Sequence, residues 1–212
     1  MMISFPEMAS LLAHPMKIEG VLHVGAHLCE EEPIYLGLGL SLNRIVWVEG
    51  DQEIAGRARF NNWARMIFSA VVSDADGQEA TFYRTNNGAS SAISPFAEHA
   101  KLYPHIKIVG QYPVRTVTLK TLFERHDLRA EDLNFLNMDI QGAELRALRG
   151  MGDEMLKCFP YIYLEVETVK LYEDSALLLE VDSFLKSKGY DRILFRETPD
   201  MGWGEAFYSN LR

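Results

Sequence analysis

Short apolar runs alternate with helix-like segments through most of the chain, and this alternation restricts the fold more than any other feature. The runs that resemble strands cover residues 21–24, 44–49, 66–73, 133–140, 161–167, 191–197 and 205–210. Helical patterns lie between most of them, over 31–40, 52–64, 121–126, 143–151 and 175–190. Strands that alternate with helices are typical of an α/β fold with a parallel sheet. We therefore predict a mostly parallel sheet with helices on both faces.

The helical patterns also predict which side chains face the core. In the segment 52–64 these are Ile54, Ala58 and Trp63. The segment 175–190 has a clearer apolar face, which is made of Leu177, Leu178, Val181, Phe184 and Leu185 and is followed by Gly189 as its stop. The helix over 143–151 is expected to end at Gly150 or Gly152.

The periodic pattern weakens over residues 85–112. Residues 86–94 are rich in Asn, Ser and Gly, which is typical of a loop. Long loops in compact domains are often lids, so we predict a lid or substrate loop over 85–112. Residues 79–84 alternate as a hairpin strand would, residues 114–119 are extended, and residues 1–18 are interpreted as a short N-terminal capping helix.

Composition excludes several classes of protein. The 212 residues carry a net charge of -9, which argues against binding nucleic acid through its phosphates. No apolar run approaches the about 20 residues that a membrane span requires. The opening lacks the features of a signal peptide, and Cys29 and Cys158 are interpreted as free thiols. We expect one domain over 1–212, located in the cytoplasm; the sequence does not predict its oligomeric state.

Glycines and acids follow the predicted strands. In open α/β sheets, ligands bind outside the carboxyl ends of the strands, near the point where strand order reverses. The candidate cofactor-binding residues at these ends are Gly25, Ala26, His27, Glu31, Glu49, Gly50, Val71, Asp74 and Asp139. Glu49 ends the second strand, 24 residues after Gly25. An acid at this position typically binds the two ribose hydroxyls of a nucleotide, although a solvated acid that caps a helix is the alternative.

The glycine pattern distinguishes between nucleotides. A dinucleotide fold would require G-x-G-x-x-G, whereas residues 25–29 contain one glycine. Glu30, Glu31 and Glu32 follow and would repel a pyrophosphate, but they would not repel a sulfonium cation. S-adenosylmethionine has a ribose, an adenine and a positive centre, and it has no phosphate. We therefore predict S-adenosylmethionine as the cofactor.

The runs HVGAH, WVEG, SAVVSDADGQEATFY, LNFLNMDIQGAELRALRGM and YIYLEVE occur in this order. Together they resemble the FkbM family of S-adenosylmethionine-dependent methyltransferases, over about residues 21–190. The resemblance implies a Rossmann-like class I methyltransferase with a seven-stranded sheet, which O-methylates sugar or polyketide hydroxyls. His23, His27 and Cys29 depart from the usual Asp, Asn and second Gly of the family. His23 is interpreted as a core histidine, and His27 as either a ligand contact or a structural residue.

In-line methyl transfer to a hydroxyl requires a group that removes the proton. Asp139 is the first candidate base, and Glu165, at the end of the next strand, is expected to face the same crevice. Glu144 is a third catalytic candidate, with helix capping or loop ordering as its alternative role. Asp139 and Glu165 could instead hold Mg²⁺ or Mn²⁺, which prefer oxygen ligands.

Asn87, Ser90 and Ser91 are the candidate substrate residues, because their side chains can bond to the hydroxyls of a sugar. The predicted function is therefore O-methylation of a sugar, a glycan or another small acceptor. Two alternatives remain from the sequence. One is an NAD(P)-dependent oxidoreductase, and the other is a non-catalytic nucleotide-binding module of the same fold.

Overall fold

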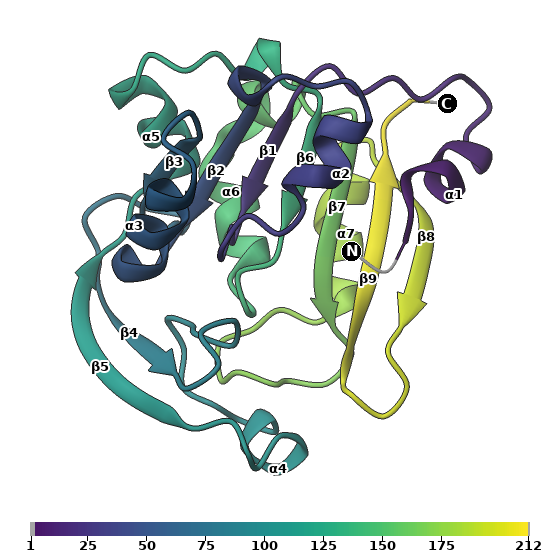
Figure 1. The fold of residues 1–212 in the computed structure, drawn as a ribbon. Coiled ribbons are helices and arrows are strands. Elements are labelled where there is room, and N and C mark those ends of the chain that lie inside the picture. The colour runs from purple at the N-terminus through teal and green to yellow at the C-terminus, as the bar shows by residue number, and fades with distance from the viewer. Residues whose placement is uncertain (1–2, 212) are drawn as a thin grey trace.

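The computed structural model describes residues 3–211 and contains one large sheet and a separate hairpin (Figure 1). The large sheet has seven strands in the order β3-β2-β1-β6-β7-β9-β8. Their bounds are β1 Val21–Val24, β2 Ile45–Glu49, β3 Met66–Ser69, β6 Phe135–Met138, β7 Tyr161–Glu167, β8 Asp191–Glu197 and β9 Trp203–Ser209. The first five strands in the sheet order are parallel, and β9 is antiparallel to both β7 and β8. The predicted mostly parallel, seven-stranded sheet is confirmed.

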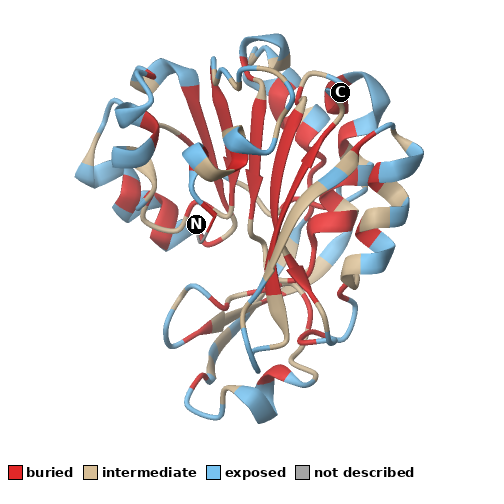
Figure 2. Cartoon of the chain, turned by 90° about the vertical axis from the view of Figure 1, so that its right-hand side faces the viewer, coloured by how far each residue is buried: buried red, intermediate tan, exposed pale blue. Residues whose placement is uncertain are grey.

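Helices cover both faces of the large sheet, as predicted. The helices are α1 Phe5–Ser10, α2 Glu32–Gly37, α3 Gln52–Asn61, α4 His99–Leu102, α5 Leu119–Arg125, α6 Glu144–Leu156 and α7 Leu178–Ser187. Alternate residues of each central strand point to opposite faces, so Leu22 packs with α5, α6 and α7, whereas Val21 packs with α1, α2 and α3. Because both faces are covered, the central strands are buried throughout (Figure 2).

The order of strands reverses between β1 and β6. From β1 the chain continues outward to β2 and then to β3, and it later returns to place β6 on the other side of β1. Val24 pairs with Val48 of β2 and with Met138 of β6, so these three strands end level with one another. The crevice at this reversal is where ligands bind in open α/β sheets.

The hairpin consists of β4 Glu79–Thr85 and β5 Ile108–Arg115, which are antiparallel. It lies beyond the carboxyl ends of the parallel strands, together with α4 (Figure 1). Its two ends lie side by side a few residues beyond β3, because Val72 forms an isolated parallel bridge with Val117. The Arg84 guanidinium of β4 binds Asp51 and Glu53 at the start of α3, with a Nε–Oδ2 distance of 2.6 Å to Asp51.

The prediction that Trp63 faces the core is wrong. Its side chain is 73% exposed and contacts Phe60, which is 72% exposed. The helix α3 ends at Asn61, so helical periodicity no longer decides where Trp63 points. Ile54 and Ala58 lie within the helix and are buried, as predicted.

Several predicted boundaries also differ from the structure. The strand expected over 66–73 ends at Ser69, and residues 108–112 of the expected loop belong to β5. By contrast, the helix expected over 143–151 does stop at Gly152, whose φ of 70° and ψ of 164° are not helical, and a second helical segment then continues α6 to Leu156. The capping helix is shorter than expected, and Met1 and Met2 lie outside the described residues.

Within residues 3–211, no helix is both long enough and apolar enough to cross a membrane. Cys29 is buried, Cys158 is partly buried, and both are free thiols, as predicted.

Candidate functional site

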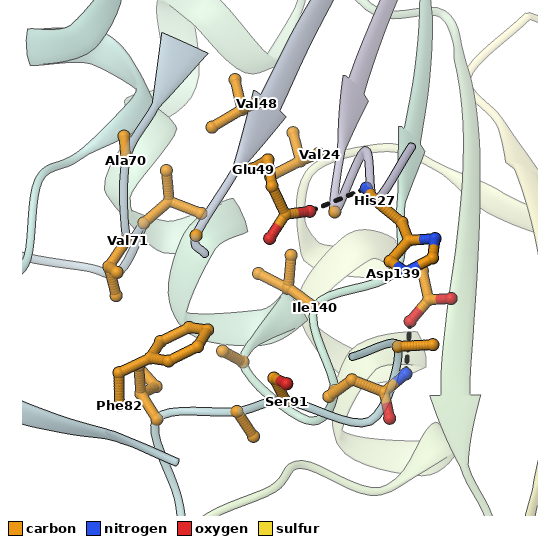
Figure 3. A pocket seen from close by; sticks show the side chains of 18 of the residues that line it. Val24, His27, Val48, Glu49, Ala70, Val71, Phe82, Ser91, Asp139 and Ile140 are labelled. Atoms are coloured by element: carbon orange, nitrogen blue, oxygen red, sulfur yellow. Dashed lines mark hydrogen bonds between the residues drawn. The ribbon is translucent and has the colours of Figure 1, made fainter. Parts of the chain in front are cut away.

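A cavity lies where β1, β2, β3 and β6 end, and β4 and the loop that follows it close one side (Figure 3). The strand ends contribute Gly25, Glu49, Gly50 and Asp139, all of which were predicted from the sequence. Val71 and His27 also line the cavity, as predicted. The strand reversal and the cavity therefore coincide.

Gly25 forms the floor of this cavity because no other residue fits there. Its φ is 88°, a conformation that residues with a Cβ rarely adopt. A Cβ built on Gly25 would lie 1.7 Å from the backbone oxygen of Asp139. The segments after β1 and β6 approach each other so closely because the Asp139 N–H donates to the Val24 carbonyl at 2.9 Å.

Glu49 is held by backbone groups on either side of the cavity. Its Oε2 accepts the His27 N–H at 2.7 Å, and its Oε1 accepts the Asp51 N–H at 2.7 Å. Burial raises the pKa of Glu49, and these two hydrogen bonds oppose that rise. Asp51, rather than Glu49, caps α3, because its Oδ1 accepts the N–H groups of Glu53 and Ile54. Glu49 is therefore not the solvated capping acid of the alternative interpretation.

The segment after Gly25 adopts left-handed backbone conformations at residues other than glycine. His27 has a φ of 43° and Cys29 a φ of 63°, at two positions where this chain departs from the family motif. The His27 Nδ1 lies 2.6 Å from the Glu30 carboxylate, which also accepts the Leu28 N–H. Side-chain contacts of this loop therefore hold the backbone in a conformation that glycine would adopt more easily.

An apolar wall faces Glu49 across the cavity. Ala70 and Val71 follow β3, and Phe82 comes from β4 (Figure 3). A Cβ on Gly50 would lie 3.0 Å from the Phe82 ring, so glycine at this position lets the ring approach the strand end. The sequence prediction did not include Phe82, because a phenylalanine in an alternating strand is ordinarily a core residue. No local pattern identifies it as a cavity residue.

A second cavity adjoins the first and is rich in carboxylates. It contains the predicted residues Ala26 and Glu31, and it places Asp139 and Glu165 together. The Gln141 amide Nε2 donates to both carboxylates, at 2.6 Å to Asp139 Oδ1 and at 3.0 Å to Glu165 Oε1. Burial raises the pKa of each acid, and the charge of Asp139 raises that of Glu165 further. The structure thus brings the first two catalytic candidates to one site.

Glu144 is placed differently. Its Oε1 accepts the N–H groups of Ile140 at 2.7 Å and Gly142 at 3.3 Å, so it orders the turn after β6. Burial raises the pKa of Glu144 to about 8. Glu144 does not line either of the two cavities, and this geometry corresponds to the loop-ordering role.

The pKa of Glu144 predicts how it affects folding stability. Because its pKa is raised in the folded state, the stability of the protein should fall as pH rises from about 4.3 towards 8, by at most about 1.4 kcal/mol per unit. Glu144→Gln keeps an oxygen acceptor and cannot ionise, so the variant should lose less stability over this range. Chemical denaturation at pH 5 and pH 8 checks this; an equal loss in both proteins would contradict it.

The other predicted site residues are more scattered. Ser91 lines the first cavity, whereas Asn87 and Ser90 bond to each other within the loop, through Nδ2 and Oγ at 3.0 Å. The structure does not bring Asp74 to either cavity: it is exposed and accepts a hydrogen bond from the Ser73 hydroxyl. Asp74 was expected to follow a strand over 66–73, but β3 ends four residues earlier, at Ser69. Asp74 therefore belongs to the turn towards the hairpin.

His23 lies in the core beside the second cavity. Its Nδ1 is 2.9 Å from the Tyr35 hydroxyl, which also accepts from the Asn137 amide at 2.8 Å. Burial lowers the pKa of His23 to about 3, so it is neutral. This corresponds to the core role that the sequence suggested. Across residues 3–211, no group of three or more His, Cys, Asp or Glu side chains is arranged to hold a metal ion.

The strand order, the glycine turn and the acid at the end of β2 define a Rossmann-like class I methyltransferase fold. The chain belongs to the FkbM methyltransferase domain family, whose model matches residues 23–192. No curated protein is similar enough to the chain to match it.

Known structures resemble the chain in fold. A methyltransferase FkbM from Methylobacillus flagellatus KT has a TM-score of 0.58 at 15% identity, and the match covers 97% of this chain and 46% of that one. This chain thus spans about half the length of that protein. A SAM-dependent methyltransferase from Aquifex aeolicus has a TM-score of 0.48 at 10% identity, covering 99% and 91% of the two chains.

Proposed function

We propose that this protein is an S-adenosylmethionine-dependent O-methyltransferase that acts on a hydroxyl of a sugar, a glycan or another small molecule. The observation that carries the proposal is the placement of Glu49 and Asp139 on opposite sides of one crevice, at the strand reversal. Glu49 is buried and each of its oxygens keeps a free lone pair, whereas Asp139 is partly buried and lies beside the Glu165 carboxylate. This pair supplies a ribose contact and a proton acceptor.

The residues of the cavity fit the cofactor. Each Glu49 oxygen accepts one backbone N–H and retains a lone pair for a ribose hydroxyl. Ala70, Val71 and Phe82 form a flat apolar wall suited to an adenine ring. The bound cofactor would supply a methyl group on a positively charged sulfur. The carboxylates of the second cavity attract such a charge, and they would repel a pyrophosphate.

Asp139 and Glu165 suit the removal of a proton from an alcohol. Both are partly buried, and their pKa values are raised, so each is a stronger base than a solvated carboxylate. Positioned base catalysis contributes roughly 10²–10⁴-fold to a rate. A divalent ion on Asp139 and Glu165 remains part of this proposal as an alternative way to activate the hydroxyl.

The acceptor is proposed to enter beside the loop after β4. Ser91 lies at the cavity, where its Oγ accepts the Thr85 N–H at 3.1 Å and lies 3.2 Å from the Thr85 hydroxyl, so a ligand hydroxyl would compete with Thr85 for the Ser91 hydrogen. Polar loop side chains beside a carboxylate suit an acceptor with several hydroxyls.

The direct test uses S-adenosylmethionine labelled on its methyl group, with a panel of monosaccharides, glycan fragments and small alcohols. Each reaction is run with and without EDTA, and transfer of label to a hydroxyl is measured. Transfer that persists in EDTA indicates that a carboxylate alone is the base, whereas transfer that stops indicates a metal. Failure of the protein to bind S-adenosylmethionine in calorimetry would contradict the proposal.

Glu49→Gln is expected to weaken the binding of both S-adenosylmethionine and S-adenosylhomocysteine, each by about tenfold or more, because a bond to a charged acceptor contributes about 1.5–3 kcal/mol. The Gln amide would also direct one NH₂ group at a backbone N–H. Isothermal titration calorimetry measures both affinities. Glu79→Gln, on the exposed side of the hairpin, is the matched control and should leave them unchanged. Unchanged affinities in Glu49→Gln would exclude the ribose contact.

A further inference from the structure

Gln141 connects the two carboxylates of the candidate site. Its amide Nε2 carries two hydrogens, and the structure directs one towards Asp139 and the other towards Glu165. Both acceptors are partly buried, and a carboxylate removed from water without a donor is costly to keep charged. Burial raises the pKa of both acids, and the two Gln141 hydrogen bonds oppose that rise while they fix the positions of the two carboxylates.

A tyrosine fixes which way the amide faces. The Tyr172 hydroxyl donates to Gln141 Oε1 at 2.6 Å. Burial and the neighbouring carboxylates raise the pKa of Tyr172, so the hydroxyl stays protonated. If the amide were reversed, its oxygen would face the two carboxylates. Its NH₂ group would then face the Tyr172 hydroxyl, which would lose Gln141 Oε1 as its acceptor. The Tyr172 donor therefore selects the orientation in which the NH₂ group meets the acids.

The backbone supports this arrangement. Gln141 and Gly142 both adopt left-handed conformations, with φ values of 55° and 91°. A Cβ on Gly142 would lie 2.7 Å from the Ser175 Cβ, so the turn is packed tightly against the segment that carries Tyr172. The strained backbone at Gln141 returns its side chain towards Asp139, two residues earlier in the chain. Gln141 is thus fixed by its backbone turn and by hydrogen bonds at both ends of its amide, unlike a solvated loop residue.

The same tyrosine reaches the candidate substrate loop. The Ser90 carbonyl oxygen lies 3.2 Å from the Tyr172 hydroxyl. A continuous set of contacts therefore runs from the loop through Tyr172 and Gln141 to the acids.

We propose that Gln141 is a positioning residue: its amide, oriented by Tyr172, holds the Asp139 and Glu165 carboxylates so that they face the positive sulfur of the cofactor. This inference rests on the proposed function, because it assigns those acids to the cofactor's charge. It predicts a specific effect on charge recognition. Removing the amide should weaken binding of the cationic S-adenosylmethionine and leave that of neutral S-adenosylhomocysteine almost unchanged.

The test compares calorimetric affinities for the two ligands in wild-type protein, Gln141→Leu and Tyr172→Phe. Gln141→Leu should lose about tenfold in affinity for S-adenosylmethionine and less than about twofold for S-adenosylhomocysteine, because tenfold corresponds to one modest electrostatic contact. Tyr172→Phe removes only the hydroxyl that orients the amide. Tyr172→Phe should lose less affinity for S-adenosylmethionine than Gln141→Leu does, and again almost none for S-adenosylhomocysteine. If Gln141→Leu does not fold, the Tyr172→Phe affinities test the inference alone.

Gln111→Leu is the matched control, because Gln111 is an exposed amide residue on β5. It should leave both affinities at wild-type values. An equal loss for both ligands in the Gln141 and Tyr172 variants would show a merely structural role, and no loss for either ligand would show no role; both results overturn the inference. Absence of binding in the wild-type protein would instead overturn the proposed function, so the two failures are distinguishable.

Discussion

Gly25→Ala is expected to abolish cofactor binding and to destabilise the fold by at least about 3 kcal/mol, since a strained φ alone costs about 1–3 kcal/mol. The added methyl carbon would lie 1.7 Å from the Asp139 backbone oxygen, so β1 and β6 would have to move apart at their ends. That movement would displace Asp139 and open the crevice. Chemical denaturation measures the stability, and calorimetry with S-adenosylhomocysteine measures the binding.

Gly39→Ala is a control that separates the cost of the backbone conformation from that of the contact between the new Cβ and Asp139. Gly39 has the same φ of 88° as Gly25, but a Cβ built on it meets no atom within 4 Å. Gly39→Ala should therefore show the cost of the backbone conformation alone and retain cofactor binding. If the two alanine variants lost the same stability, the close approach of β1 and β6 would contribute nothing and the argument for Gly25 would be wrong.

Asp139→Asn is expected to reduce methyl transfer by roughly 10²–10⁴-fold, the usual contribution of a positioned base. Asparagine has nearly the same shape and keeps an oxygen that can accept the Gln141 amide, so the crevice should remain intact. S-adenosylhomocysteine should bind within a few-fold of the wild-type affinity. Single-turnover transfer of labelled methyl to the best acceptor of the panel provides the measurement.

Asp153→Asn serves as the comparison for Asp139→Asn. Asp153 lies on the surface, where its carboxylate binds Lys188 at 2.6 Å. This variant should transfer methyl groups at the wild-type rate. Wild-type turnover in Asp139→Asn itself would remove Asp139 from the reaction and leave Glu165 as the remaining candidate.

The sequence predicted the fold class and the residues at the strand ends because both follow from local patterns. Buried parallel strands appear as continuous apolar runs, and the residue after each run must lie at the carboxyl edge of the sheet. For that reason the sequence predicts that Gly25, Glu49 and Asp139 lie together, and the structure brings them to one cavity.

Other features depend on contacts between distant segments, which a single sequence does not reveal. Phe82 reaches the cavity because the hairpin lies beyond the sheet edge, and Gln141 meets Glu165 because β6 and β7 are neighbours. Trp63 leaves the core because α3 ends at Asn61, before the helical pattern of the sequence does. Asp74 lies away from both cavities because β3 ends at Ser69, although the apolar pattern continues beyond it.

The bridge between Val72 and Val117 determines where this fold can accept variation. The chain leaves β3 and comes back to the same place at Val117, so the segment between these two residues is anchored at both ends. Exchanging or lengthening that segment would alter the side of the cavity that it lines, where the acceptor is proposed to enter. The acids at the ends of β2 and β6 would keep their positions. New acceptor ranges could thus evolve by variation within a single contiguous stretch of sequence.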